Sequence, residues 1–325
     1  MRRTLSLLAV FGMLCCVASV PRAQSAQTGL AYDEITKFLS ADANPQPGSF
    51  ASDFQAAINA QRSAANSGGH GGLFGAIQNA IGAAQGAIAS FSSGFASSHY
   101  YLNGWERTDD VGAQTATIVK PSQRQTISLN LAKKTYRIET SGTANASEPV
   151  SPAERPQSGQ ERQAQPGSGR LDITVSTQSL GSQVIEEVPT TGYRTTFNMT
   201  QSQSTGSCRD GTFQTTVTEY VSRYMEPHAG VTRPRQRPAS FARPERVALR
   251  PGCRPKITTH TSVSGEAPED RLAMWVLVTV SGNAPSAEGQ RSGGFSTLIE
   301  RGNVRVLTAN DSNLFAIPAG FTQEQ

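Results

Sequence analysis

Apolar and polar residues alternate with a period of two along much of the chain beyond residue 99. Leu129 and Leu131, for example, alternate with Ser128 and Asn130. Such alternation is typical of strands that bury one face. It predicts short strands at 127–131, 136–138, 171–175, 193–199, 213–220, 257–263, 295–299, 304–307 and 314–317.

The run from Leu272 to Val280 has a different pattern, because both of its faces are apolar. Val276 and Val278 fall on one side and Trp275 and Leu277 on the other. A strand covered on both faces has this composition. The run is therefore the best candidate for a central strand.

The region 24–98 is predicted to be helical and linker, followed by a β domain over 99–325. Residues 30–39 have helical spacing at Ile35 and Phe38, and the prolines around 45–48 end that segment. A second short helix is expected over 50–62. The predicted fold class is mainly β with an N-terminal helical region (α+β), in which an antiparallel curved sheet or incomplete barrel packs with one or more helices.

An apolar helix is expected over 73–95, inside a stretch from Ser63 to Trp105 that has no charged residue. Its apolar side chains recur at helical spacing and form one stripe, namely Phe74, Ile77, Ile81, Ile88, Phe91 and Phe95. Three interpretations remain open: a helix packed on a sheet, a helix at a membrane interface, and a mobile lid over an apolar cleft. In the last of these the stripe faces a ligand.

Two segments interrupt the β pattern. The stretch 144–169 is rich in Pro, Gln, Ser, Glu and Gly, which predicts a flexible linker. The stretch 227–255 alternates arginines with prolines and carries a local charge of +6, from Arg233, Arg235, Arg237, Arg243, Arg246, Arg250 and Arg254 against Glu245. It is interpreted as a solvated extended loop or as a contact for anionic surfaces such as lipid head groups or envelope polymers.

The first 23 residues predict a signal peptide. Arg2 and Arg3 precede an apolar run that is too short for a permanent membrane span. We therefore expect an exported protein, periplasmic or extracellular, with outer-membrane association as one form of it. After cleavage Cys208 and Cys253 remain, and an oxidising compartment favours a disulfide between them over two buried free thiols.

Charge and motifs exclude several function classes. The formal net charge of +4 includes three arginines of the leader, and without them 26 basic residues face 25 acidic ones. A generally cationic nucleic-acid binder is not expected, and few aromatic residues accompany the arginines of the loop. The chain has no nucleophile elbow, phosphate loop or zinc-protease motif. We predict no catalytic residue, no metal and no cofactor.

Scattered motifs between residues 99 and 325 resemble a bacterial family of exported β-rich domains of unknown function. They are Gly104-Trp105-Glu106-Arg107, a strand pair ending in Lys134-Thr135-Tyr136, Thr191-Gly192-Tyr193-Arg194, and the closing Phe315-Ala316-Ile317-Pro318-Ala319-Gly320-Phe321. That family is in turn similar to the periplasmic lipoprotein carriers. The resemblance implies an unclosed barrel that holds acyl chains beneath a helical lid.

These observations lead to a non-enzymatic, exported cell-envelope protein that binds a lipid or another apolar ligand in its curved sheet. The alternative is a structural or adhesion protein of the envelope that binds anionic surfaces through the Arg233–Arg254 loop. A third hypothesis is a hydrolase of envelope polymers, which no sequence motif supports.

Overall fold

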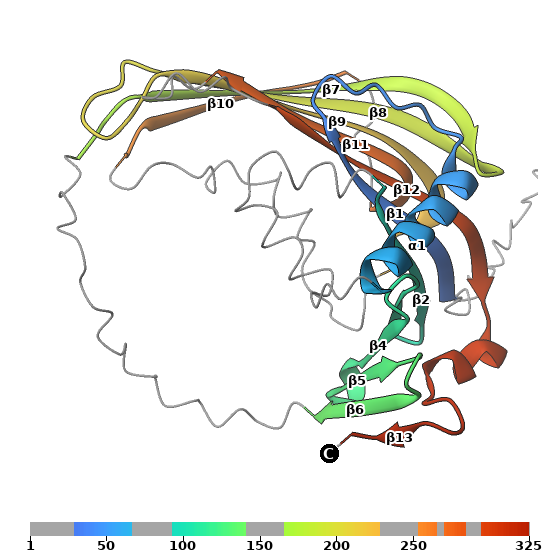
Figure 1. Cartoon of the computed structure of the whole chain (residues 1–325). Coiled ribbons are helices and arrows are strands. Elements are labelled where there is room, and N and C mark those ends of the chain that lie inside the picture. Colours follow the sequence, from blue (N-terminus) through green and yellow to red (C-terminus); the bar gives the residue numbers. More distant parts are fainter. Residues whose placement is uncertain are drawn as a thin grey trace, which may run out of the picture.

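A computed structural model describes residues 29–66, 93–140, 166–227, 253–264, 270–283 and 294–324. The described chain is mostly β and forms one open sheet of 13 strands, ordered β10-β7-β8-β9-β11-β12-β1-β2-β3-β4-β5-β6-β13. The sheet curves strongly into a C shape without closing (Figure 1). The predicted fold class, a curved sheet or incomplete barrel, is confirmed.

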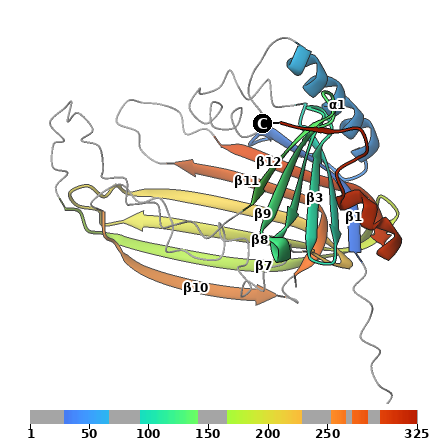
Figure 2. The same cartoon turned by 90° about the horizontal axis from the view of Figure 1, so that it is seen from below.

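The strands fall into two sets of different length. The shorter ones, apart from the two-residue β13 (Thr322–Gln323), are β2 (Phe95–Leu102), β3 (Trp105–Asp110), β4 (Thr115–Lys120), β5 (Gln125–Asn130) and β6 (Thr135–Thr140). The longer ones are β1 (Gly29–Ser40), β7 (Arg170–Ile185), β8 (Val188–Ser202), β9 (Gly211–Met225), β10 (Lys256–Ser264), β11 (Arg271–Asn283) and β12 (Phe295–Leu307). Figure 2 shows β10, β7, β8, β9 and β11 side by side.

The expected helix over 30–39 is wrong, because these residues form β1. This strand pairs with β12 on one side and β2 on the other, both antiparallel. Both faces of β1 are covered, so its apolar residues follow no simple alternation, and the spacing of Ile35 and Phe38 resembles a helix. The predicted boundary at residue 98 between a helical region and a β domain is therefore also wrong, because β1 and the first residues of β2 already belong to the sheet.

The other strand predictions hold in most places. The predicted central strand is β11, which lies between β9 and β12. The predicted strands 295–299 and 304–307 are two parts of β12. The sheet is antiparallel except at its two ends, where β10 pairs with β7 and β13 pairs with β6 in parallel.

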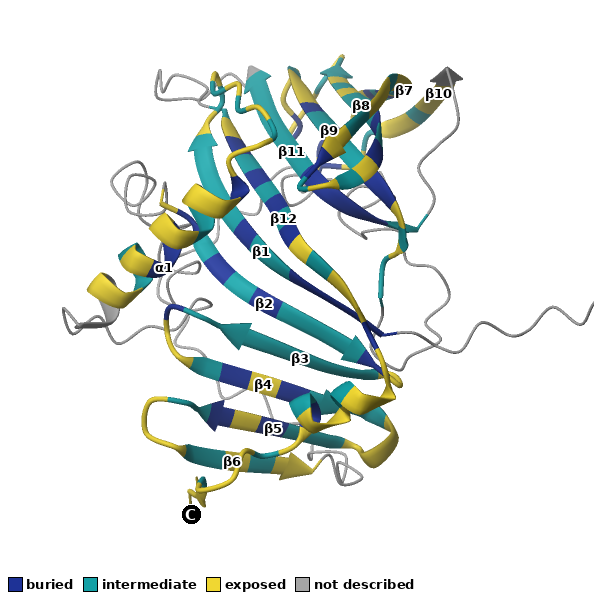
Figure 3. Cartoon of the chain, turned by 90° about the vertical axis from the view of Figure 1, so that its right-hand side faces the viewer, coloured by how far each residue is buried: buried dark blue, intermediate teal, exposed yellow. Residues whose placement is uncertain are grey.

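The expected helix over 50–62 is confirmed as α1 (Phe50–Asn66), which crosses the ends of β12, β1 and β2 (Figure 3). Phe50 and Ala57 of α1 are buried against Ile35 of β1 and Ala96 of β2. The helix approaches β12 so closely that a Cβ atom on Gly302 would lie 2.3 Å from the Phe50 ring. Glycine at 302 therefore allows this packing.

The predicted strand 314–317 is also wrong, because residues 309–315 form the 3-10 helix η3 (Ala309–Phe315). Thr308 and Asp311 cap each other at its start, which favours a helical turn over a strand. Phe315 of η3 is fully buried against Trp105, at a ring-centroid distance of 5.9 Å. It closes a core with buried residues of the first hairpins, including Ala116, Ile118, Ile127 and Leu129.

The predicted disulfide between Cys208 and Cys253 is present, with a Cα–Cα distance of 4.9 Å. Cys253 also forms an isolated parallel β-bridge with Gly167, and the Arg254 N–H donates to the Gly167 carbonyl at 3.0 Å. The end of the predicted linker 144–169 is therefore held against the start of β10. Its residues 144–165 lie outside the described residues, as do the predicted signal peptide and residues 73–92 of the predicted apolar helix.

Candidate ligand-binding surface

The two faces of the sheet are covered differently. We call the face that carries α1 and η3 the outer face and the opposite one, which lines the hollow of the C, the inner face (Figure 1). Directly paired residues on neighbouring strands share a face. The strand register therefore assigns every side chain of the sheet to one of the two.

The inner face of β7, β8, β9, β11 and β12 is rich in apolar residues, with Thr177, Thr195, Thr215 and Thr297 interspersed among them. Ile173, Met199 and Phe213 form one row across neighbouring strands. Further inner-face residues, set by the same register, are Val175, Tyr193, Phe197, Val217, Val276, Val278, Val280, Phe295 and Ile299. Phe213 and Phe295 are 41 % and 45 % exposed, so this apolar surface is in part open to solvent.

The outer face of β7, β8 and β9 is largely polar, whereas on β11 and β12 it holds the buried Trp275 and Leu298. Thr174 pairs with Asn198 and Asn198 with Gln214, whose side chain donates to the Asn198 amide oxygen at 2.7 Å. Beyond β1 the inner face becomes more polar. There the outer face holds the buried core under η3, and the inner face carries a polar row that includes Thr108, Thr117 and Ser128.

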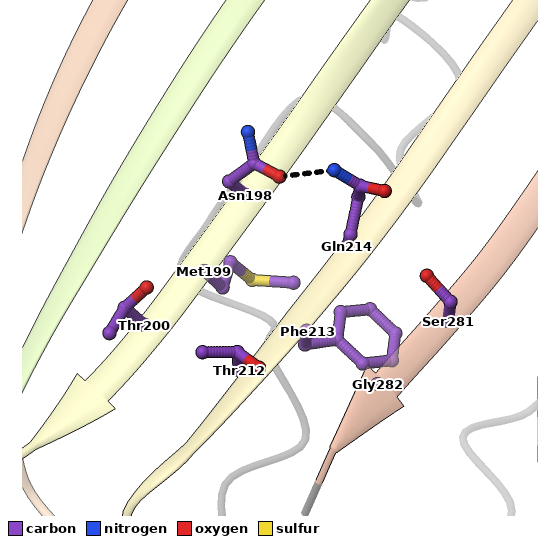
Figure 4. Close-up of a pocket in the computed structure, with 8 residues that line it drawn as sticks. All are labelled: Asn198, Met199, Thr200, Thr212, Phe213, Gln214, Ser281 and Gly282. Carbon is purple, nitrogen blue, oxygen red and sulfur yellow. Dashed lines mark hydrogen bonds between the residues drawn. The ribbon is translucent and has the colours of Figure 1, made fainter. Parts of the chain in front are cut away.

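A depression of about 490 Å³ lies where β8 ends, β9 begins and β11 ends, beside Thr200, Thr212 and Gly282 (Figure 4). Five of its lining residues, Asn198, Thr200, Thr212, Gln214 and Ser281, belong to the polar outer-face rows, and Met199, Phe213 and Gly282 belong to the inner face. This lining is too polar for an alkyl chain. The inner face is therefore the better candidate for an apolar ligand.

One carboxyl group lies within the apolar rows. Glu219 of β9 pairs with Tyr193 on β8 and Val276 on β11. Within the described residues its carboxyl makes no hydrogen bond or ion pair. Burial, and secondarily the charge of Glu226, raise the pKa of Glu219. An unpaired carboxylate in this position attracts a cation or a hydrogen-bond donor.

Beside Glu219 the inner face continues into an ionic and aromatic cluster on β12, β1 and β2. The Arg301 guanidinium lies 2.8 Å from the Glu34 carboxylate, donates to the Ala273 carbonyl at 2.9 Å and covers the Tyr32 ring at 5.3 Å. Glu226 lies 3.7 Å from the same guanidinium. Arg301 is thus fully engaged by protein groups.

Aromatic rings extend this cluster. Tyr32 stacks on His99 at 5.1 Å and on Tyr101 at 6.2 Å, and the Tyr101 hydroxyl donates to Glu106. Burial raises the pKa of Tyr32 to about 12, against the lowering effect of Arg301. Burial also raises the pKa of Tyr101. Both phenols therefore stay protonated at neutral pH.

His99 makes the stability of this cluster sensitive to pH. Burial lowers its pKa, and Arg301 acts in the same direction, while Glu34, Glu106 and Asp33 oppose it. The ring contacts Ser97 at 3.0 Å and Thr108 at 3.4 Å. Because the unfolded chain takes up the proton more readily, stability should fall as the pH drops below about 6.5.

Urea unfolding at pH 7.5 and pH 5.5 would measure this effect. We expect His99→Gln to show a weaker loss on acidification than the unmodified protein. His260→Gln, at an exposed position on β10, serves as the control and should leave the pH dependence unchanged. An equal loss in the His99 variant and the unmodified protein would contradict the assignment.

Only some of the candidate residues predicted from the sequence lie within the described part of the structure. Phe74, Ile77, Ile81, Ile88 and Phe91 lie outside the described residues, as do the arginines of the loop from Arg233 to Arg250. Phe95 belongs to a strand and not to the expected helix, and it pairs with Thr36 on the inner face. Arg254 is exposed beside the disulfide.

The sequence reasoning missed Glu219 and the cluster around Arg301. The sequence could have revealed Glu219, because in an alternating strand it points to the same face as Phe213 and Val217. No such signal exists for the cluster, whose members come from positions 32–34, 99–106, 226 and 301. Only the strand order brings them together.

Among the described residues, no group of three His, Cys, Asp or Glu side chains is arranged to hold a metal ion. The helices of that same part are too short or too polar to cross a membrane. No family model, curated protein or solved structure matches the chain. The resemblance to exported β-rich domains and lipoprotein carriers therefore stays a prediction.

Proposed function

We propose that this protein is an exported, non-enzymatic binding protein for a ligand with a long alkyl chain, which lies on the inner face of β7, β8, β9, β11 and β12. One observation carries the proposal: this face is rich in apolar residues and partly open at Phe213 and Phe295, while the other face of β7, β8 and β9 is largely polar. An exposed apolar patch with such a boundary is typical of a binding site.

The dimensions of the surface suit an alkyl chain. Glu219 lies six positions beyond Phe213 on β9, which corresponds to about 20 Å at roughly 3.3 Å per residue. One leaflet of a bilayer has a hydrocarbon thickness of roughly 15 Å, so a membrane-lipid chain could lie along this distance. Burial would stabilise it by about 0.8 kcal/mol per methylene. The disulfide is compatible with export.

Nile red, a neutral apolar dye, provides a direct test. The full-length mature protein should bind it with increased fluorescence, and palmitate or another long-chain amphiphile should displace it. We expect Phe213→Ser combined with Phe295→Ser to weaken dye binding at least tenfold, because each ring offers apolar contact worth about 1.5 kcal/mol or more. Both rings are already exposed, so the fold should tolerate the change.

Gln214→Ser is the matched control, since Gln214 is exposed on the opposite face of the same strand. It should bind the dye like the unmodified protein. If the unmodified protein binds no Nile red, the surface is filled by the chain itself and the proposal is wrong. Equal loss in the control and in the double variant would place the dye elsewhere.

A further inference from the structure

The charges of the inner face indicate which head group the alkyl ligand carries, an inference that rests on the function proposed above. We propose that the ligand is a single-chain amphiphile with a cationic amine or ammonium head group, which binds at Glu219. Three features of the described residues support this choice over an anionic head group.

The first feature is the position of Glu219. Its carboxyl lies in the apolar rows between Tyr193 and Val276, and Val217 precedes it on the same face. It has no hydrogen-bond or ion-pair partner within the described residues. Glu219 is half-buried. A carboxylate partly shielded from water is costly without a counterion, so a ligand cation would provide the missing positive charge.

The second feature is the state of Arg301, the cation of the cluster beside Glu219. Its guanidinium is already held by Glu34, Glu226 and the Ala273 carbonyl, and its side chain is 12 % exposed. It is therefore unavailable to a carboxylate or phosphate. A free fatty acid would instead meet the uncompensated charge of Glu219 and a second carboxylate at Glu226.

The third feature is the aromatic side chain next to the carboxyl. Tyr193 is directly opposite Glu219 on β8 and is half-buried on the same face. The face of a tyrosine ring attracts an ammonium group through its quadrupole, and a carboxylate beside the ring adds direct charge attraction. This pairing of a carboxylate and a ring suits a cation at the end of an alkyl chain.

Displacement of Nile red by two probes of equal chain length tests the inference. Hexadecyltrimethylammonium, used below its micelle concentration, should displace the dye at a concentration at least tenfold lower than palmitate does. Glu219→Gln should lose this advantage, with ammonium binding weakened about tenfold and Nile red binding unchanged. Palmitate binding should be equal or tighter in the variant.

Glu139→Gln is the matched control, because it removes the same charge from an exposed position on β6. It should keep the preference for the ammonium probe. Tighter binding of palmitate than of the ammonium probe, or an unchanged preference in Glu219→Gln, would overturn the inference while leaving the proposed function intact. Failure of every amphiphile to displace the dye would instead contradict the proposed function itself.

Discussion

Replacing Lys37 by methionine is expected to lower the free energy of unfolding by about 3–5 kcal/mol, the usual cost of removing one partner from a buried ion pair. The Lys37 ammonium contacts Asp53 and lies 3.4 Å from the Glu300 carboxylate. Glu300 is 2 % exposed, and burial raises its pKa although Lys37 opposes the shift. Methionine keeps most of the aliphatic stem but leaves Glu300 without its counterion.

Urea unfolding at pH 7 would measure this loss. The loss should shrink as the pH falls towards the ordinary glutamate pKa of about 4.3, because a protonated Glu300 needs no counterion. Lys37→Met combined with Glu300→Gln should recover part of the stability at pH 7. A change below about 0.5 kcal/mol in the single variant, as at an ordinary surface site, would show that the pair is not buried in solution.

Removal of the disulfide is expected to have an effect of similar size. Replacing Cys208 and Cys253 by serine opens a loop with a sequence separation of 45 residues, which corresponds to about 4 kcal/mol in the chain-entropy model. The bond also holds the start of β10 beside Gly167, at the point where β10 begins its parallel pairing with β7. The edge strand should therefore loosen before the rest of the sheet.

Hydrogen exchange would resolve the two parts of this prediction. In the serine variant, amides of β10 should exchange much faster, while those of β11, which lies between two other strands, should change only with global stability. Reduction of the unmodified protein by dithiothreitol should give the same pattern. Uniform protection of β10 after loss of the bond would contradict the anchoring role.

Local patterns predicted the fold class and most strands, including the central strand β11, and failed at residues 30–39 and 314–317. The alternating strands and α1 were found because one face of each is buried. Residues 30–39 were misread because β12 and β2 flank β1 and both its faces are covered. At 314–317 a local cap formed by Thr308 and Asp311 outweighed the apolar pattern.

The sequence by itself determined that this protein is a β-rich chain with a paired Cys208 and Cys253, and that polar and apolar residues alternate along its strands. Only the tertiary structure decided which side of the sheet each apolar stripe faces. Alternation specifies two faces but not which one a neighbouring strand or helix covers, and that depends on strand order and on where α1 and η3 pack. For this reason the inner apolar surface, with Glu219 in it, became visible only in the assembled sheet.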